Sequence, residues 1–78
     1  MQIGKYQHFK NKNIYEVVGT ALHSETQEEM VIYKALYYCE RFDFNQLWVR
    51  PKKMFLEILE YKGIKVPRFK FLEEISLD

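Results

Sequence analysis

The chain has 78 residues, of which 47% are hydrophobic and 29% are charged, so it has enough apolar residues for one core and too little length for two. Its formal net charge of +1 gives no long-range field that would concentrate nucleic acid or an anionic membrane. A single cysteine, Cys39, excludes an internal disulfide and, with two histidines, falls short of a four-ligand zinc set.

Those counts favour a reducing compartment, and the ends of the chain fit that expectation. Residues 1–10 lack the apolar stretch of a secretory signal, and the longest apolar run, 35–39, is too short to span a membrane. We therefore expect a cytoplasmic domain over residues 1–78 that does not contact a membrane. Its ordered core should cover about residues 4–72, with a frayed end at 73–78.

The first half of the chain predicts two strands joined by a short turn. Residues 6–10 alternate in character, and the asparagine-rich segment 11–13 that follows suits a turn. Residues 14–23 are rich in β-branched and aromatic side chains, which favour a strand. Within it, Gly19 marks a bulge, a bend or a close approach of another backbone.

A polar break at residues 24–29 leads into a third predicted strand. Residues 30–38 contain a Val-Ile-Tyr run and end in a tyrosine pair, and such side chains lose rotamer freedom in a helix. A helix is the alternative, because Ser24 and Gln27 match a capping box. We favour the strand.

The second half of the chain begins with a charged, turn-prone segment at residues 40–45. Residues 47–50 then predict a short strand that is stopped by Pro51. Residues 51–63 suit a helix with proline at its first position and glycine just past its end. They equally suit a hairpin that turns at residues 62–63, and periodicity does not decide between the two.

Residues 68–71, with the sequence RFKF, interleave basic and aromatic side chains after Pro67, which should lie at a strand end or edge. This pattern occurs in proteins that bind single-stranded nucleic acid. Strand alternation, however, places the phenylalanines and the charges on opposite faces, so we expect a core face and a solvated face.

The most function-like block combines a histidine, two hydroxyls and a carboxylate at a strand end: His23, Ser24, Glu25 and Thr26. With Arg50 nearby, such groups could hold a small polar or anionic ligand. Alternatively, the two hydroxyl side chains bond to their own backbone in a turn and the carboxylate pairs with a base, which is the interpretation we favour.

Trp48 and Arg50 are two positions apart and should share one face of their strand, where the guanidinium can stack on a ring or hold a carboxylate or phosphate. The simpler role of Arg50 is an ion pair with Glu25, Glu57 or Glu60. His8 is expected to be a hydrogen-bonded histidine at the surface or a sheet edge. Cys39 is expected to be a small hydrophobe, because no base adjoins it.

No motif in the sequence predicts a metal or a cofactor. The two histidines belong to different strands, and no HxxxH, CxxC or calcium-loop pattern is present. The three glycines are isolated, which excludes a phosphate-binding loop. We also predict no catalytic residue.

Seven sequence blocks follow one another along the chain: YQHFK at residues 6–10, YEV at 15–17, HSET at 23–26, YKALY at 33–37, LWVRP at 47–51, MF at 54–55 and VPRF at 66–69. Taken in this order, they resemble the bacterial family called domain of unknown function 1653 over about residues 4–71. The resemblance implies a mainly β fold, a small SH3-like barrel of about five to six short antiparallel strands, with a short turn or helical piece near Pro51 and a hairpin after it. It implies no established activity, substrate or partner.

From these observations we expect a non-catalytic binding module for a small polar ligand or a protein partner. One alternative is a small enzyme in which His23 acts as a general base, Glu25 orients it and Arg50 stabilises an anion. Another is a weak binder of single-stranded nucleic acid through the basic residues in 62–70, which the net charge does not favour. The predicted ligand-binding residues are His23, Ser24, Glu25, Thr26, Trp48 and Arg50.

Overall fold

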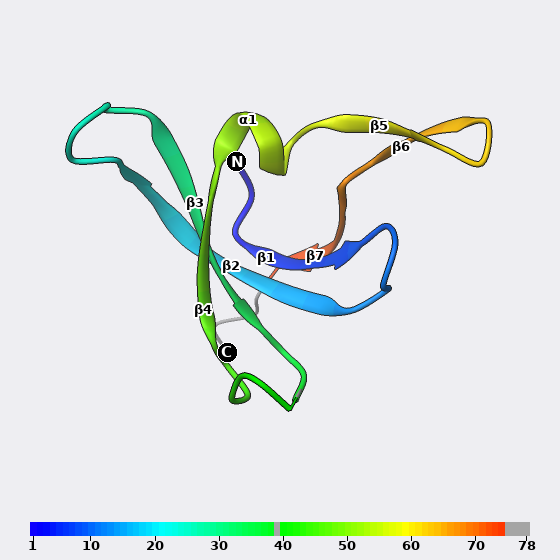
Figure 1. The fold of residues 1–78 in the computed structure, drawn as a ribbon, viewed down its shortest axis with the longest axis horizontal. Coiled ribbons are helices and arrows are strands. Elements are labelled where there is room, and N and C mark those ends of the chain that lie inside the picture. The colour runs from blue at the N-terminus through cyan, green and yellow to red at the C-terminus, as the bar shows by residue number, and fades with distance from the viewer. Residues whose placement is uncertain (39, 75–78) are drawn as a thin grey trace.

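Seven strands and one short helix make up the fold in the computed structural model, which describes residues 1–38 and 40–74. Five strands form an antiparallel sheet in the order β4-β3-β2-β1-β7, and β5 and β6 form a separate hairpin (Figure 1). The predicted mainly β, antiparallel fold is confirmed, with more strands than the five to six expected. The elements are β1 Gly4–His8, β2 Ile14–Leu22, β3 Glu29–Ala35, β4 Leu47–Pro51, α1 Lys52–Phe55, β5 Ile58–Tyr61, β6 Ile64–Pro67 and β7 Phe69–Glu74.

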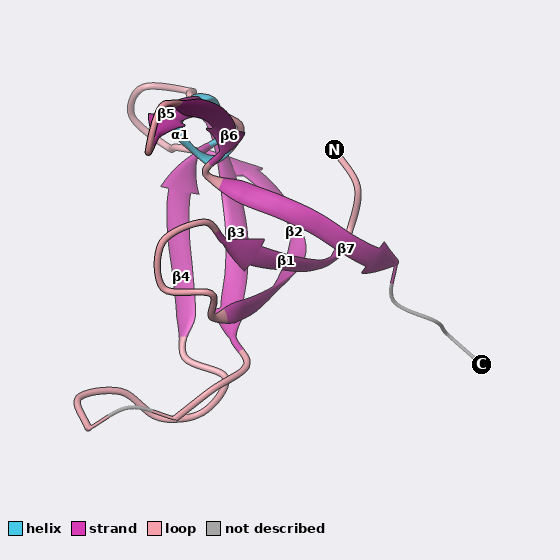
Figure 2. Ribbon diagram, turned by 90° about the vertical axis from the view of Figure 1, so that its right-hand side faces the viewer, coloured by secondary structure: helices cyan, strands magenta, loops and turns pink. Residues whose placement is uncertain are grey.

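The main sheet is strongly twisted but not closed. β4 and β7 form its two edges, and the pairings of the described residues do not join them (Figure 2). Between these two strands the chain forms α1 and the β5–β6 hairpin, which projects away from the sheet (Figure 1). The SH3-like barrel is therefore not confirmed, because closure requires the edge strands to pair.

The long strand β2 changes its pairing partners near Gly19. Its first half pairs with both β1 and β3, and the register with β3 shifts between Val17 and Gly19. The predicted irregularity at Gly19 is thus a β-bulge, which bends a strand and increases its twist. Beyond it, Thr20 to Leu22 pair with β3 alone, so the β2–β3 hairpin extends past the other strands (Figure 1).

The core is built mainly from aromatic rings: among residues 1–38 and 40–74, five of the eight buried hydrophobic side chains are tyrosine or phenylalanine. Phe55, which α1 carries, is 1% exposed and stacks on Phe69 with ring centroids 4.2 Å apart. Tyr6 and Tyr33 meet Phe55 edge-on at 5.3 and 5.4 Å. Such pairs contribute roughly 0.5–1.5 kcal/mol each beyond the area that they bury. The buried set is Tyr6, Tyr15, Val17, Val31, Tyr33, Ala35, Phe55 and Phe69.

The ambiguous segment 51–63 forms one helical turn and then a hairpin, so the helix alternative holds for residues 52–55 only. Pro51 precedes the single helical turn of Lys52–Phe55, and the hairpin follows it. The hairpin turns at Lys62 and Gly63, both with positive φ (52° and 84°), as expected for a two-residue connection. The predicted helical piece near Pro51 and the predicted hairpin are both confirmed.

Three smaller expectations are tested by the strands. The third strand forms, although it ends at Ala35 rather than at residue 38, and no helix starts at Ser24. Phe69 is buried and Lys70 is exposed, so the expected alternation over 68–71 is confirmed. We expected residues 73 and 74 to fray. They belong to β7 instead, because they pair with Lys5 and Gly4.

The expectations for Cys39 and for residues 75–78 lie outside the described residues. Across residues 1–38 and 40–74, no helix is both long enough and apolar enough to span a membrane.

Candidate functional site

The block at residues 23–26 forms the exposed turn between β2 and β3. The His23 Nδ1 atom accepts hydrogen bonds from the backbone N–H groups of Glu25 (3.1 Å) and Thr26 (3.3 Å). Thr26 Oγ1 accepts one from the Glu28 N–H at 3.2 Å. Ser24, like the other three residues of the block, is exposed. The structural alternative is thus met in part: Thr26 bonds to its own backbone, His23 does so in place of Ser24, and Glu25 has no salt bridge to a described residue.

The structure does not bring this turn together with Arg50. Arg50 pairs with Val31 in the sheet, whereas the turn begins beyond the last pair of the hairpin, Leu22 and Glu29. The cleft that Arg50 lines includes no residue of the turn. The arrangement that the enzyme alternative requires, with His23 and Glu25 beside Arg50, is absent from the described residues.

Trp48 and Arg50 lie together, as strand alternation predicted. They occupy the same face of β4 and line a cleft of about 190 Å³ together with Tyr15, Tyr33 and Tyr37. Tyr33 lies directly opposite Trp48 in the β3–β4 register. Trp48 and Tyr37 are half-buried and pack against the core, so one wall of the cleft is continuous with the hydrophobic interior.

The guanidinium of Arg50 is held by aromatic neighbours and not by a carboxylate. Its Nε donates a long hydrogen bond to the Tyr33 hydroxyl (3.4 Å), and its Cζ lies 5.7 Å from the centre of the Phe69 ring. The expected ion pair with Glu25, Glu57 or Glu60 is not formed, and Glu57 pairs with Arg68 instead. Over residues 1–38 and 40–74, this half-buried cation has no salt bridge.

The tyrosine hydroxyls add hydrogen-bonding groups to the same cleft. The hydroxyls of Tyr15 and Tyr37 are 2.7 Å apart and share a hydrogen bond. Burial raises the pKa of Tyr15, and the hydrogen bond with Tyr37 raises it further. Tyr15 is therefore a neutral phenol at physiological pH, able to donate a hydrogen bond.

The sequence interpretation missed these three tyrosines. Tyr33 and Tyr37 are four positions apart along the predicted third strand, so alternation alone places them on one face. Tyr15 joins them because the β2–β3 register sets it opposite Ala35, midway between the two. That register was not available from the sequence.

His8, at the end of β1, stands among positive charges. Its ring meets Phe69 edge-on at 5.1 Å, and its Nδ1 accepts a hydrogen bond from the Lys10 N–H at 3.2 Å. Burial lowers the pKa of His8, and the charges of Arg50, Arg68 and Lys10 lower it further. His8 is hydrogen-bonded and half-exposed, at the end of an inner strand and not at a sheet edge.

In the part of the chain that the structure describes, no three histidine, cysteine or carboxylate side chains lie close enough together to hold a metal ion. The groups that converge at the cleft are donors and aromatic rings.

Comparisons with known proteins match this chain to one family. The model of a family described as a protein of unknown function, DUF1653, matches residues 4–71. The crystal structure of a DUF1653 protein from Bordetella bronchiseptica superimposes with a TM-score of 0.83 at 24% identity, over 100% of this chain and 95% of that one. No curated protein matches the sequence.

Proposed function

The chain belongs to the DUF1653 family, and we propose that it is a binding module for a small anion, held in the cleft between Arg50 and the tyrosines. One observation carries the proposal: Arg50 is half-buried, and its guanidinium has no carboxylate partner among the described residues. Removing a charge from water is unfavourable unless an opposite charge or hydrogen bonds compensate it. A bound anion would supply that compensation.

The chemistry of the cleft favours a carboxylate or a phosphate. A guanidinium presents parallel N–H groups that match two oxygens of such an anion. The Tyr15–Tyr37 pair, whose hydroxyls share one hydrogen bond, keeps one O–H that can donate to the anion. The indole of Trp48 supplies an apolar wall. The cleft volume of about 190 Å³ is below the roughly 300–1,000 Å³ of sites for drug-sized ligands, so the ligand should be compact.

Binding without catalysis fits the side chains of the cleft better than turnover. The residues that line it are three tyrosines, one tryptophan and one arginine. A general base must accept a proton near neutral pH, whereas burial raises the pKa of Tyr15 and a guanidinium stays charged. The enzyme alternative is therefore the weaker one for this cleft.

An NMR titration of the ¹⁵N-labelled protein with inorganic phosphate, and separately with acetate, tests the proposal. The amides of Trp48 and Arg50 should shift in a saturable way. Arg50→Gln should remove the saturable shifts, and Arg50→Lys, which keeps the charge and loses the planar fork, should weaken binding about tenfold. Lys53→Gln is the matched control, because it removes one exposed positive charge away from the cleft and should bind as the parent does.

Two results would overturn the proposal. In one, neither anion moves the β4 amides at millimolar concentration. In the other, Arg50→Gln binds as tightly as the parent while its remaining spectrum shows an intact fold.

A further inference from the structure

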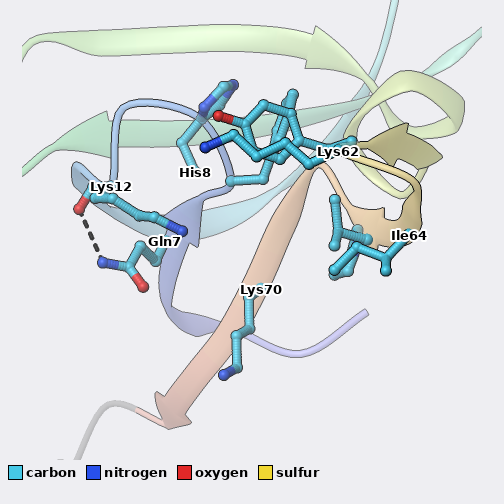
Figure 3. A pocket seen from close by; sticks show the side chains of 10 residues that line it. Gln7, His8, Lys12, Lys62, Ile64 and Lys70 are labelled. Atoms are coloured by element: carbon cyan, nitrogen blue, oxygen red, sulfur yellow. Dashed lines mark hydrogen bonds between the residues drawn. The ribbon is translucent and has the colours of Figure 1, made fainter.

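A second, larger cavity lies between the β1–β2 turn and the β5–β6 hairpin. It has a volume of about 320 Å³, which is within the usual range for small-molecule sites (Figure 3). His8, Phe9 and Lys12 contribute to it from one side, Tyr61 and Ile64 from the hairpin, and Lys70 from β7. We call it the lysine groove. It shares no lining residue with the arginine cleft.

The inner surface of the lysine groove is largely apolar. The rings of Phe9 and Tyr61 meet edge-on with centroids 5.2 Å apart and tie the β1–β2 turn to the hairpin. Ile64 lines the groove while 62% exposed, and Val66 lies two positions along the same strand face. An exposed apolar surface in a concave site favours a ligand with an apolar body, because covering it removes that surface from water.

The rim of the groove is positively charged. Lys12, Lys62 and Lys70 surround it, and none of the described residues that line it is acidic (Figure 3). The salt bridges of the described residues employ other cations, Lys5, Lys34, Lys52 and Arg68, so none of these rim lysines has a carboxylate partner there. The rim is therefore complementary to a negative charge.

Two of the rim lysines lie at positions with positive φ in tight turns, which set where each lysine leaves the backbone. Lys12 and Lys62 both have positive φ, 63° and 52°, which side-chain-bearing residues adopt infrequently. The Lys12 carbonyl accepts a hydrogen bond from Gln7 Nε2 at 2.9 Å, and Lys62 Nζ lies 5.3 Å from the centre of the Tyr61 ring. Both turns thus place a lysine at the edge of the apolar surface.

From these observations we propose that the lysine groove binds an amphipathic organic anion, a carboxylate or sulfonate carried on an aromatic or branched aliphatic body. The body covers Phe9, Tyr61 and Ile64, and the anionic group lies among the rim lysines. This site is separate from the arginine cleft, and its ligand differs in needing an apolar part.

A set of three matched probes tests the two requirements separately by NMR titration. 1-Naphthoate carries both body and charge, 1-naphthalenemethanol carries the body alone, and acetate carries the charge alone. Naphthoate should shift the amides of Phe9, Lys12, Tyr61 and Ile64 in a saturable way. Each of the other two probes should bind the groove at least tenfold more weakly.

Variants locate the site. Lys62→Asn with Lys70→Gln should weaken naphthoate binding about tenfold, asparagine being chosen because it tolerates positive φ. The control, Lys53→Gln with Lys65→Gln, removes the same charge from exposed positions that do not line the groove and should leave binding unchanged. Unshifted amides outside the groove show that each variant is folded.

The inference fails if saturating naphthoate leaves the groove amides unmoved, if the alcohol binds as tightly as naphthoate, or if the control pair weakens binding as much as the rim pair. Arg50→Gln keeps the two proposals apart. Naphthoate should still bind the lysine groove of Arg50→Gln. If Arg50→Gln loses naphthoate binding while the rim-lysine variant keeps it, the probe binds in the arginine cleft. That result would overturn the inference about the lysine groove and leave the proposed function of the arginine cleft standing.

Discussion

The β2–β3 turn and the arginine cleft show two ways in which polar side chains can be placed. The turn gathers its polar groups from adjacent positions, and their hydrogen bonds return to the local backbone. The cleft gathers its groups from β2, β3, β4 and the loop after β3, against a buried aromatic core. Polar residues that are close in sequence can satisfy one another, whereas those brought together by the fold can remain available to a ligand.

The two regions should differ most in how much they contribute to stability. Phe55→Ala removes the stacked centre of the core beneath the cleft and should lower the free energy of unfolding by about 3–5 kcal/mol. Because a domain of this length has a total stability of roughly 4–12 kcal/mol, the variant should lose at least about a quarter of its stability. Urea denaturation followed by tryptophan fluorescence measures the change.

The matched substitution at the hairpin tip is Leu22→Ala, which truncates a side chain that is 68% exposed. It should change stability by no more than about 0.5 kcal/mol. A loss at Leu22 comparable to that at Phe55 would show that the hairpin is covered in solution, and the contrast between the two regions would be wrong.

Removing a hydroxyl should lower the free energy of unfolding more in the arginine cleft than in the β2–β3 turn, although both losses are smaller than that of Phe55→Ala. Tyr37→Phe removes one partner of the hydrogen bond at Tyr15 and should cost about 1 kcal/mol, because it leaves a part-buried hydroxyl without its protein partner. Thr26→Val, which removes the acceptor for an exposed N–H in the turn, should cost less, because water can replace it. Equal losses in chemical denaturation would contradict the distinction.

The smallest expected effect is a pH dependence that comes from His8. Since the fold lowers its pKa, the unfolded chain binds the proton more readily, and stability should fall as the pH drops below the unfolded value of about 6.5. The loss is complete once the pH is below the folded value. His8→Gln should flatten the stability profile below about pH 6.5. If the free energy of unfolding of His8→Gln changes with pH as steeply as that of the parent, the pH dependence comes from other groups.

Most of the strands could be predicted from the sequence, because β-branched and aromatic residues and alternation mark them directly. Gly19 also indicated its bulge. The open sheet could not be predicted, since closure depends on whether β4 and β7 meet, and the segment 52–67 between them carries no signal for that. The family resemblance led us to expect a barrel that the strand pairing does not confirm.

The candidate site was predicted in part. Alternation correctly put Trp48 and Arg50 on one face, but nothing in the sequence indicated which residues lie opposite them. That depends on the β2–β3 and β3–β4 registers, and the β2–β3 register differs by one residue on either side of the Gly19 bulge. The HSET block, by contrast, attracted attention because its polar residues are neighbours in sequence, which is also why they can bond within their own turn.

The pairing of β1 with β7 has a consequence for how the protein is made. These strands come from opposite ends of the described chain, and β7 carries Phe69, the ring that stacks on Phe55. While the chain is still emerging from the ribosome without β7, β1 has a partner on one side only and the aromatic core lacks its central stack. The domain should therefore complete its fold only after β7 has been released, and partly made chains will expose aromatic surface until then.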